Sequence, residues 1–255
     1  MIPFIRPRPL DEPAVRLVVC HHAGGSGSAY FPLARLLPHD WDVLLLDLPG
    51  RGKRHSAAPL RDMTTMAARA ADDIAPWAGP PLALFGHSMG AVVAVEAARL
   101  LQERGAGPAW VGVSGRLAPP DAVPTPRLDP ALPDEELMAG LTAMGGIPDR
   151  FDEAPEFRRR FLRLIRSDLY ALGHHRADPA RRPLAAPLTA FGATRDDLSP
   201  PALLGNWAAE TDRTFRQYLS EGGHFHFLDD GFAAFARALT DEIRHALRLA
   251  QSAPA

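Results

Sequence analysis

The chain has 255 residues, of which 46% are hydrophobic and 23% are charged, the proportions of an ordinary globular protein and not of a disordered or fibrous one. Its 28 Lys and Arg residues against 30 Asp and Glu give a net charge of −2. No nucleic-acid or anionic-membrane partner is therefore indicated, because such surfaces need an excess of positive charge. The single cysteine, Cys20, cannot form an intrachain disulfide, and neither a signal-peptide core nor an apolar run of about 18–20 residues is found. We expect a cytoplasmic protein without membrane segments.

Strand-like and helix-like segments alternate along residues 1–116. Short apolar runs predict strands at residues 14–20, 41–50, 81–86 and 110–115, because buried parallel strands have nearly continuous hydrophobic sequences. The segments between them predict helices at residues 28–37, 63–77 and 89–105. This alternation is typical of a doubly wound, mostly parallel α/β sheet with helices on both faces.

The alternation is interrupted in residues 117–182, which combine proline-rich loops with helical patterns. It resumes with strands at residues 187–192 and 213–219 and helices at residues 202–210 and 230–250. Ligands bind at the carboxyl ends of the strands in sheets of this type, so an all-helical insertion is most simply a lid over that edge. We therefore expect an α/β core formed by residues 1–116 and 183–255 and a helical lid insertion at residues 117–182.

The pentapeptide Gly86-His87-Ser88-Met89-Gly90 has the pattern G-x-S-x-G and lies between an apolar strand and a long helix. In this context a nucleophilic serine occupies a sharp strand-to-helix turn. The glycines leave room for the turn, and the helix that begins at Met89 directs its N-terminal amides at the serine. The pentapeptide alone could be a chance occurrence in a glycine-rich turn, but its position predicts Ser88 as a nucleophile.

A serine hydroxyl becomes a good nucleophile only when a base takes its proton. His224 stands in Gly222-Gly223-His224-Phe225, directly after the last predicted strand. The chain order serine, acid, histidine places the base there. The alternative is His226, which precedes an apolar pair of residues and lacks adjacent glycines. We predict His224 as the base.

Two neighbouring carboxylates, Asp196 and Asp197, follow the predicted strand at residues 187–192. One of them is needed to fix the tautomer of His224 and to stabilise its imidazolium form. Asp196 is the preferred acid, and Asp197 is the alternative.

An acyl transfer also requires donors for the developing oxyanion. The backbone amide of Met89 is one candidate, because it follows the nucleophile. The second is expected in the loop after the first strand, His22-Ala23-Gly24-Gly25, where glycines let the main chain approach closely. We predict Ala23 as this donor, with Gly24 as the alternative. A merely flexible turn would account for the glycines but not for their position beside the predicted nucleophile.

These residues lie in segments that resemble the type II (editing) thioesterases of polyketide and nonribosomal peptide synthases, which have the α/β-hydrolase fold. The resemblance extends over almost the whole chain and rests on the segments HHAGGSGSAY (21–30), LPGRGKR (48–54), PLALFGHSMGAVVAVEAARLL (81–101), VSGRLAP (113–119) and GGHFHFL (222–228). The chain departs from the family pattern at His21 and Asp197, where the family usually has proline. Counting back from Trp207 aligns Asp196 with the aspartate of the family.

The resemblance implies a substrate in which the phosphopantetheine arm of an acyl or peptidyl carrier protein holds an acyl group as a thioester. It implies hydrolysis through an acyl-serine intermediate without a cofactor of the enzyme's own, and no metal-ligand pattern such as H-E-x-x-H is found. Two other functions stay open: an esterase or lipase acting on free small-molecule esters, and a non-catalytic binding member of the fold. A monomer is expected, because no feature of the sequence demands an oligomer.

The predicted lid has two features that bear on the substrate. Met138, Leu141 and Met144 are candidates for lining an acyl channel, with ordinary core packing as the alternative. Between residues 157 and 172, apolar residues that include Phe161 recur at helical spacing and form one face. The intervening positions hold arginines, which form either a solvated basic face or a surface that meets an acidic carrier protein; they are Arg158, Arg159, Arg160, Arg163 and Arg166.

Overall fold

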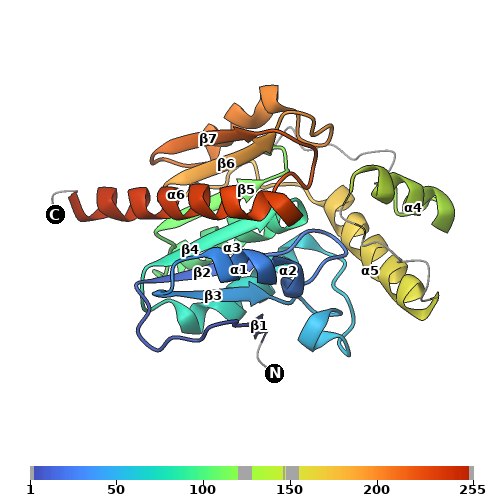
Figure 1. Cartoon of the computed structure of the whole chain (residues 1–255), viewed down its shortest axis with the longest axis horizontal. Helices are drawn as coiled ribbons and strands as arrows, with labels where there is room; N and C mark the ends of the chain where they lie inside the picture. Colours follow the sequence, from blue (N-terminus) through green and yellow to red (C-terminus); the bar gives the residue numbers. More distant parts are fainter. Residues whose placement is uncertain (1–2, 120–127, 146, 148–154, 253–255) are drawn as a thin grey trace.

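A seven-stranded sheet forms the centre of the molecule (Figure 1). The computed structural model describes residues 3–119, 128–145, 147 and 155–252. The strands are β1 (Phe4–Ile5), β2 (Val15–Cys20), β3 (Trp41–Leu46), β4 (Leu82–His87), β5 (Trp110–Ser114), β6 (Leu188–Ala193) and β7 (Phe215–Ser220). They are arranged in the order β1-β3-β2-β4-β5-β6-β7. Only the pairing of β1 with β3 is antiparallel among these strands, so the predicted mostly parallel α/β sheet is confirmed.

Helices cover both faces of the sheet, which explains why every residue of β2, β3, β4, β5 and β6 is buried. The helices are α1 (Phe31–Leu36), α2 (Met63–Ile74), α3 (Met89–Glu103), α4 (Asp134–Ala143), α5 (Pro155–His174) and α6 (Phe232–Ser252). On one face, α2 and α3 build a core that includes Met66 and Val93. On the other face, α1 and α6 build a second core that includes Leu33 and Leu239.

Two local features differ from the predicted elements. Strand β1 was not predicted, because two residues are too few to show a periodicity. Residues 202–210, predicted as a helix, belong to a 3₁₀ segment at Pro201–Glu210, in which Gly205 and Asn206 are poor formers of an α-helix.

The helices α4 and α5, which fall within the predicted insertion, lie beside the sheet and not on either of its faces (Figure 1). They pack on each other through a small core of their own, which contains Leu137, Met138, Leu141, Leu162, Ile165 and Leu169. Among the described residues, no helix is long and apolar enough to cross a membrane. The sheet edge and this helical pair together enclose the site described next.

Candidate active site

Ser88 occupies a strained turn between β4 and α3. Its φ of 56° and ψ of −115° make it the sole non-glycine residue with positive φ in the described part of the chain. The flanking glycines explain how the turn fits. A Cβ on Gly86 would lie 1.9 Å from the carbonyl oxygen of Gly90, and a Cβ on Gly90 would lie 2.1 Å from that of Cys20. The sequence therefore folds into a turn that only this spacing of glycines allows, with the serine at its apex.

The backbone amides beside Ser88 have different partners. The amide of Ser88 donates to the carbonyl of Ser114 at 2.8 Å, which holds the turn against the end of β5. Met89 is the first residue of α3, and its amide belongs to the first turn, where N–H groups have no acceptor within the helix. The amide of Met89 is therefore available to an acceptor placed over Ser88.

His224 and Asp196 form a buried pair next to this turn. The Nδ1 atom of His224 lies 3.0 Å from Oδ2 and 3.1 Å from Oδ1 of Asp196. Because an ionised carboxylate only accepts, Nδ1 carries the proton, and Nε2 is left as the basic atom of the neutral ring. Burial by itself raises the pKa of Asp196, but the hydrogen bond and charge of His224 and the amides of Leu198 and Ser199 outweigh it, so this pKa lies below its ordinary value.

Asp197 and His226, the alternative acid and base, do not take part in the pair formed by His224 and Asp196. Asp197 is exposed, whereas Asp196 is only 2% exposed. His226 places its Nε2 atom 3.3 Å from the hydroxyl of Ser114, beside the end of β5. The structure therefore brings together His224 and Asp196, the preferred members of each predicted pair.

The loop after β2 contains both candidates for the second oxyanion donor, Ala23 and Gly24, and the amide of Gly24 already donates a hydrogen bond within the protein. The amide of Gly24 donates to the Oδ2 atom of Asp168 at 2.8 Å, and the amide of Gly25 donates to the carbonyl of His22 at 3.1 Å. Ala23 lines the same cavity as Ser88. In this conformation Gly24 cannot also donate to a substrate, so Ala23 is the better placed of the two candidates.

Neutral imidazoles surround His224. Burial is the largest cause that lowers the pKa of His22 to about 4, and the charges of His224 and Arg51 act in the same direction. The pKa of His226 is lowered to about 4, again mainly by burial. Burial also places the pKa of His87 well below its ordinary value, and its ring centroid lies 4.9 Å from that of His224. His224 is thus the ring in this cluster that forms a hydrogen bond with a buried carboxylate, that of Asp196.

A cavity of about 400 Å³ opens over Ser88, a size within the range of small-molecule sites. The α/β core contributes Ala23, Ser88, Arg116 and His224 to its wall. Burial lowers the pKa of Arg116 to about 10, so this guanidinium remains a cation at neutral pH. A second cavity, of about 770 Å³, shares His22, Phe161 and Phe225 with the first and extends along the loops at residues 24–29 and 50–52.

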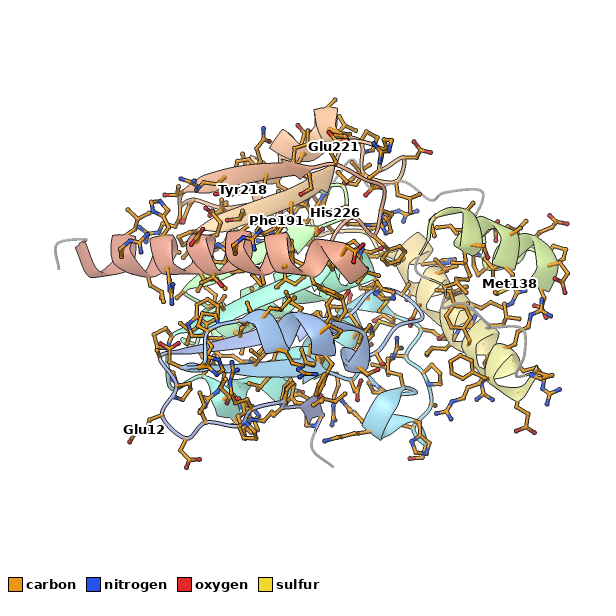
Figure 2. The ribbon with its side chains drawn as sticks, viewed as in Figure 1. Glu12, Met138, Phe191, Tyr218, Glu221 and His226 are labelled. Carbon is orange, nitrogen blue, oxygen red and sulfur yellow. The ribbon has the colours of Figure 1, made fainter. Side chains whose placement is uncertain are left out.

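The helical insertion supplies most of the apolar wall of the first cavity. The apolar side chains that it contributes include Leu141, Met144, Phe161, Ile165 and Leu169. Met138 instead lies in the small core between α4 and α5 (Figure 2). Four residues were predicted to contact the substrate. Leu141, Met144 and Phe161 line the cavity, whereas Met138 packs in the core between α4 and α5.

The arginines of α5 divide into two groups. Arg158 and Arg166, called here the inner arginines, pair with Glu135 and Asp134 of α4 at 2.8 and 2.5 Å. The others, called here the outer arginines, are exposed; they are Arg159, Arg160 and Arg163. The inner arginines thus link α5 to α4 through ion pairs. Among the arginines of α5, only the outer ones form an exposed basic surface.

Three buried residues near the site were not predicted: Asp47, Arg51 and Asp168. Arg51 forms a two-pronged ion pair with Asp168, at 2.7 and 2.9 Å. Asp47 accepts from the amides of Gly27 and Lys53 at 2.9 and 3.0 Å. The motif at residues 48–54 was a signal for the importance of Arg51, but its partner lies 117 positions away, and no local pattern marks it.

Comparison with known proteins identifies relatives over nearly the whole chain. Residues 15–243 match the family described as thioesterase domain. The thioesterase PikA5 of Streptomyces venezuelae is 33% identical over 237 residues, which cover 92% of this chain and 83% of PikA5.

Solved structures of type II thioesterases are similar as well. BorB, from the borrelidin biosynthetic cluster, superposes with a TM-score of 0.85 and 31% identity, covering 97% of this chain and 98% of BorB. YbtT, from the yersiniabactin NRPS/PKS pathway and solved also as a serine-to-alanine variant, gives a TM-score of 0.84 and 29% identity, covering 96% of this chain and 99% of YbtT. The predicted resemblance to type II thioesterases is confirmed.

Proposed function

Because the chain belongs to the thioesterase domain family, we propose that it is an editing thioesterase of polyketide or nonribosomal peptide biosynthesis. Its substrates are acyl groups, aberrant or stalled, on the phosphopantetheine arm of carrier proteins. The observation that carries this proposal is that three distant segments meet at one cavity. Ser88 and His224 both line it, and His224 is held by Asp196 at 3.0 Å.

In the first step, the Oγ atom of Ser88 attacks the thioester carbonyl while Nε2 of His224 takes the hydroxyl proton. Asp196 keeps the ring in the tautomer with Nδ1 protonated and stabilises the imidazolium that forms. The negative charge that develops on the carbonyl oxygen is stabilised by the amides of Met89 and Ala23. The imidazolium then returns its proton to the sulfur of the leaving pantetheine thiol.

In the second step, a water molecule replaces the thiol. His224 takes a proton from the water, the resulting hydroxide attacks the acyl-serine, and the proton returns to Oγ of Ser88 as the acid leaves. Both steps balance with these side chains and water, so we propose that no cofactor of the enzyme is used. Phosphopantetheine belongs to the substrate.

The acyl chain is proposed to occupy the cavity between the core and the helical insertion, with α4 and α5 acting as its lid. The apolar side chains of Leu141, Met144 and Phe161 in the cavity wall support this role, since burial of an alkyl chain against them contributes about 0.8 kcal/mol per CH₂ group. The outer arginines are proposed to meet the acidic surface of the carrier protein, which raises the rate of encounter.

The test is a panel of acyl-loaded carrier proteins and the matching free acyl-pantetheine thioesters. We expect hydrolysis of both, with a lower KM for the carrier-bound form, and a loss of about 10⁴–10⁶ in kcat for Ser88→Ala. Rapid turnover of nitrophenyl esters without any preference for the carrier would instead identify an esterase of free small molecules. Hydrolysis that survives Ser88→Ala unchanged would contradict the acyl-serine mechanism altogether.

A further inference from the structure

A buried ion pair joins the helical insertion to the loop after β3, which lies beside the loop that carries the proposed oxyanion donor. Asp168 of α5 is fully buried and Arg51, in the loop after β3, is 3% exposed. The two nitrogens Nη1 and Nη2 of Arg51 lie 2.7 and 2.9 Å from Oδ2 and Oδ1 of Asp168. This geometry satisfies both carboxylate oxygens at once and is specific to arginine.

The same carboxylate also holds the backbone of the loop after β2. Its Oδ2 atom accepts from the amide of Gly24 at 2.8 Å, in addition to the bond from Arg51. Gly24 has a φ of +73°, and a Cβ there would lie 2.8 Å from Phe161 and 2.9 Å from Ile165. Phe161, Ile165 and Asp168 are spaced by four and three residues, so one face of α5 contacts the loop at each of these positions.

The peptide group that Asp168 fixes is the one between Ala23 and Gly24. Because this group is planar, a hydrogen bond to the amide of Gly24 also sets the direction of the carbonyl of Ala23. It limits the rotation of the residue whose own amide is the proposed oxyanion donor. The carboxylate therefore acts on the donor through the backbone of Ala23, because only the φ and ψ rotations of this residue separate the fixed peptide group from the donor N–H. It does not touch the substrate.

We infer that Asp168 and Arg51 are positioning residues, which hold the Ala23 amide in its donor orientation through the Gly24 peptide when α5 is seated on the core. This inference rests on the proposed function, and it assigns a role to Arg51, the first of the two arginines in the motif LPGRGKR. It has a kinetic signature. An oxyanion donor acts on the transition state of every substrate, so loss of its orientation lowers kcat for carrier-bound and free thioesters alike.

The main test compares Asp168→Asn with Asp42→Asn. Asparagine has the same shape as aspartate but removes the charge that Arg51 requires. Asp42 is a matched control because it is fully buried and also pairs with arginines, Arg6 and Arg16 at 2.7 and 3.2 Å, but it lies near the start of β3, at the opposite end of the strand from the site. Both variants lose a buried charge pair, but only Asp168 also contacts the loop after β2.

For Asp168→Asn we expect kcat to fall by about 10–100-fold on an acyl-pantetheine and on an acyl carrier protein, with KM changed by less than about threefold. The affinity for a trifluoromethyl ketone that adds to Ser88 as a tetrahedral alkoxide should fall by the same factor as kcat/KM. Asp42→Asn should lower the thermal midpoint but leave kcat and the affinity for the ketone near those of the parent protein. Arg51→Lys, which keeps the charge but loses the two-pronged geometry, should give an intermediate kcat, and it replaces Asp168→Asn if that variant does not fold.

A second measurement does not depend on activity. Hydrogen exchange of the segment 22–26 should become faster in Asp168→Asn, and not in Asp42→Asn. Equal kcat in Asp168→Asn and the parent protein, or unchanged exchange in this segment, would overturn the inference. If the parent protein hydrolyses no thioester, the proposed function fails, and the exchange experiment still decides whether Asp168 holds the loop.

Discussion

The buried histidines around the site make a specific prediction about acid stability. His22 and His226 have pKa values lowered from 6.5 to about 4 in the folded protein. In the unfolded chain they return to about 6.5. As the pH falls below 6.5, the unfolded state takes up protons that the folded state does not, so stability is lost between about pH 6.5 and about pH 4. Above this pH range both states leave these rings neutral, so the rings do not make the stability depend on pH.

The magnitude follows from the two pKa values. Between about pH 7 and about pH 5, each of the two histidines lowers the free energy of unfolding by about 2 kcal/mol, or about 4 kcal/mol together. His21 and His87, whose pKa values burial also lowers, act in the same direction. Asp196 contributes little in this range, because its pKa lies below the ordinary value in the folded protein and is about 3.9 in the unfolded chain, so it is mostly ionised in both states above about pH 5. A loss of this size is a large part of the stability of an ordinary domain, about 5–15 kcal/mol.

The assay is urea unfolding at the two pH values for the parent protein and for His226→Gln. Glutamine retains a polar group that can bond to the Ser114 hydroxyl but does not titrate, so the loss of stability on acidification should shrink by about 2 kcal/mol. His39→Gln is the control, because His39 is exposed, and its pH dependence should equal that of the parent protein. Equal losses of free energy in His226→Gln and the parent protein between the two pH values would show that protonation of this buried ring does not lower the stability.

Three further predictions follow from the geometry of the site. In Gly90→Ala the new Cβ lies 2.1 Å from a backbone oxygen, whereas in Gly79→Ala no atom lies within 4 Å. We expect the first variant to lose about 3 kcal/mol or more in urea unfolding and the second to change little, and similar losses in both would contradict the close packing of the turn. Asp196→Asn should lower kcat by about 10³–10⁴ and Asp197→Asn by less than about threefold, and the opposite ranking would reassign the acid. Reversing the outer arginines to Glu should raise KM for an acyl carrier protein by about tenfold but not for acyl-pantetheine, and equal effects on the two substrates would reject docking at this surface.

Much of the fold could be predicted from the sequence because its signals are local. The run at residues 14–20 is β2 (Val15–Cys20), and the run at residues 81–86 is β4 (Leu82–His87). Apart from Arg16 in β2 and His87 at the end of β4, neither strand has a polar side chain, since helices cover both sides of the sheet. The turn at Ser88 could be predicted for the same reason, because the spacing of its glycines is a steric requirement within five residues. Local constraints of this kind are visible without knowledge of the tertiary structure.

The contacts that hold the site together could not be predicted in this way. Asp168 lies on an amphipathic helix whose acidic and basic residues all resemble surface residues in the sequence, and its partner is 117 positions distant. Nor did the sequence distinguish the inner arginines from the outer ones, because both groups occupy positions between the apolar residues of the same helical pattern. Their roles depend on where α4 lies relative to α5. Pairings across the fold follow from the topology, which local patterns do not contain.

One stretch of α5 combines two tasks that substitutions can separate. Phe161, Ile165 and Leu169 line the cavity over Ser88, whereas Asp168 is turned toward Arg51 and Gly24. A change that enlarges the cavity, such as Leu169→Ala, removes part of the apolar wall against which an acyl chain packs in the proposed function, so we expect it to alter the order of preference among acyl chains. A change at Asp168 acts through the oxyanion donor, which every acyl group shares, and should lower all rates by one common factor. If Leu169→Ala slowed the hydrolysis of short and long acyl chains equally, the cavity wall and the contact of Asp168 with the loop could not be changed independently, and α5 would not have two separable roles.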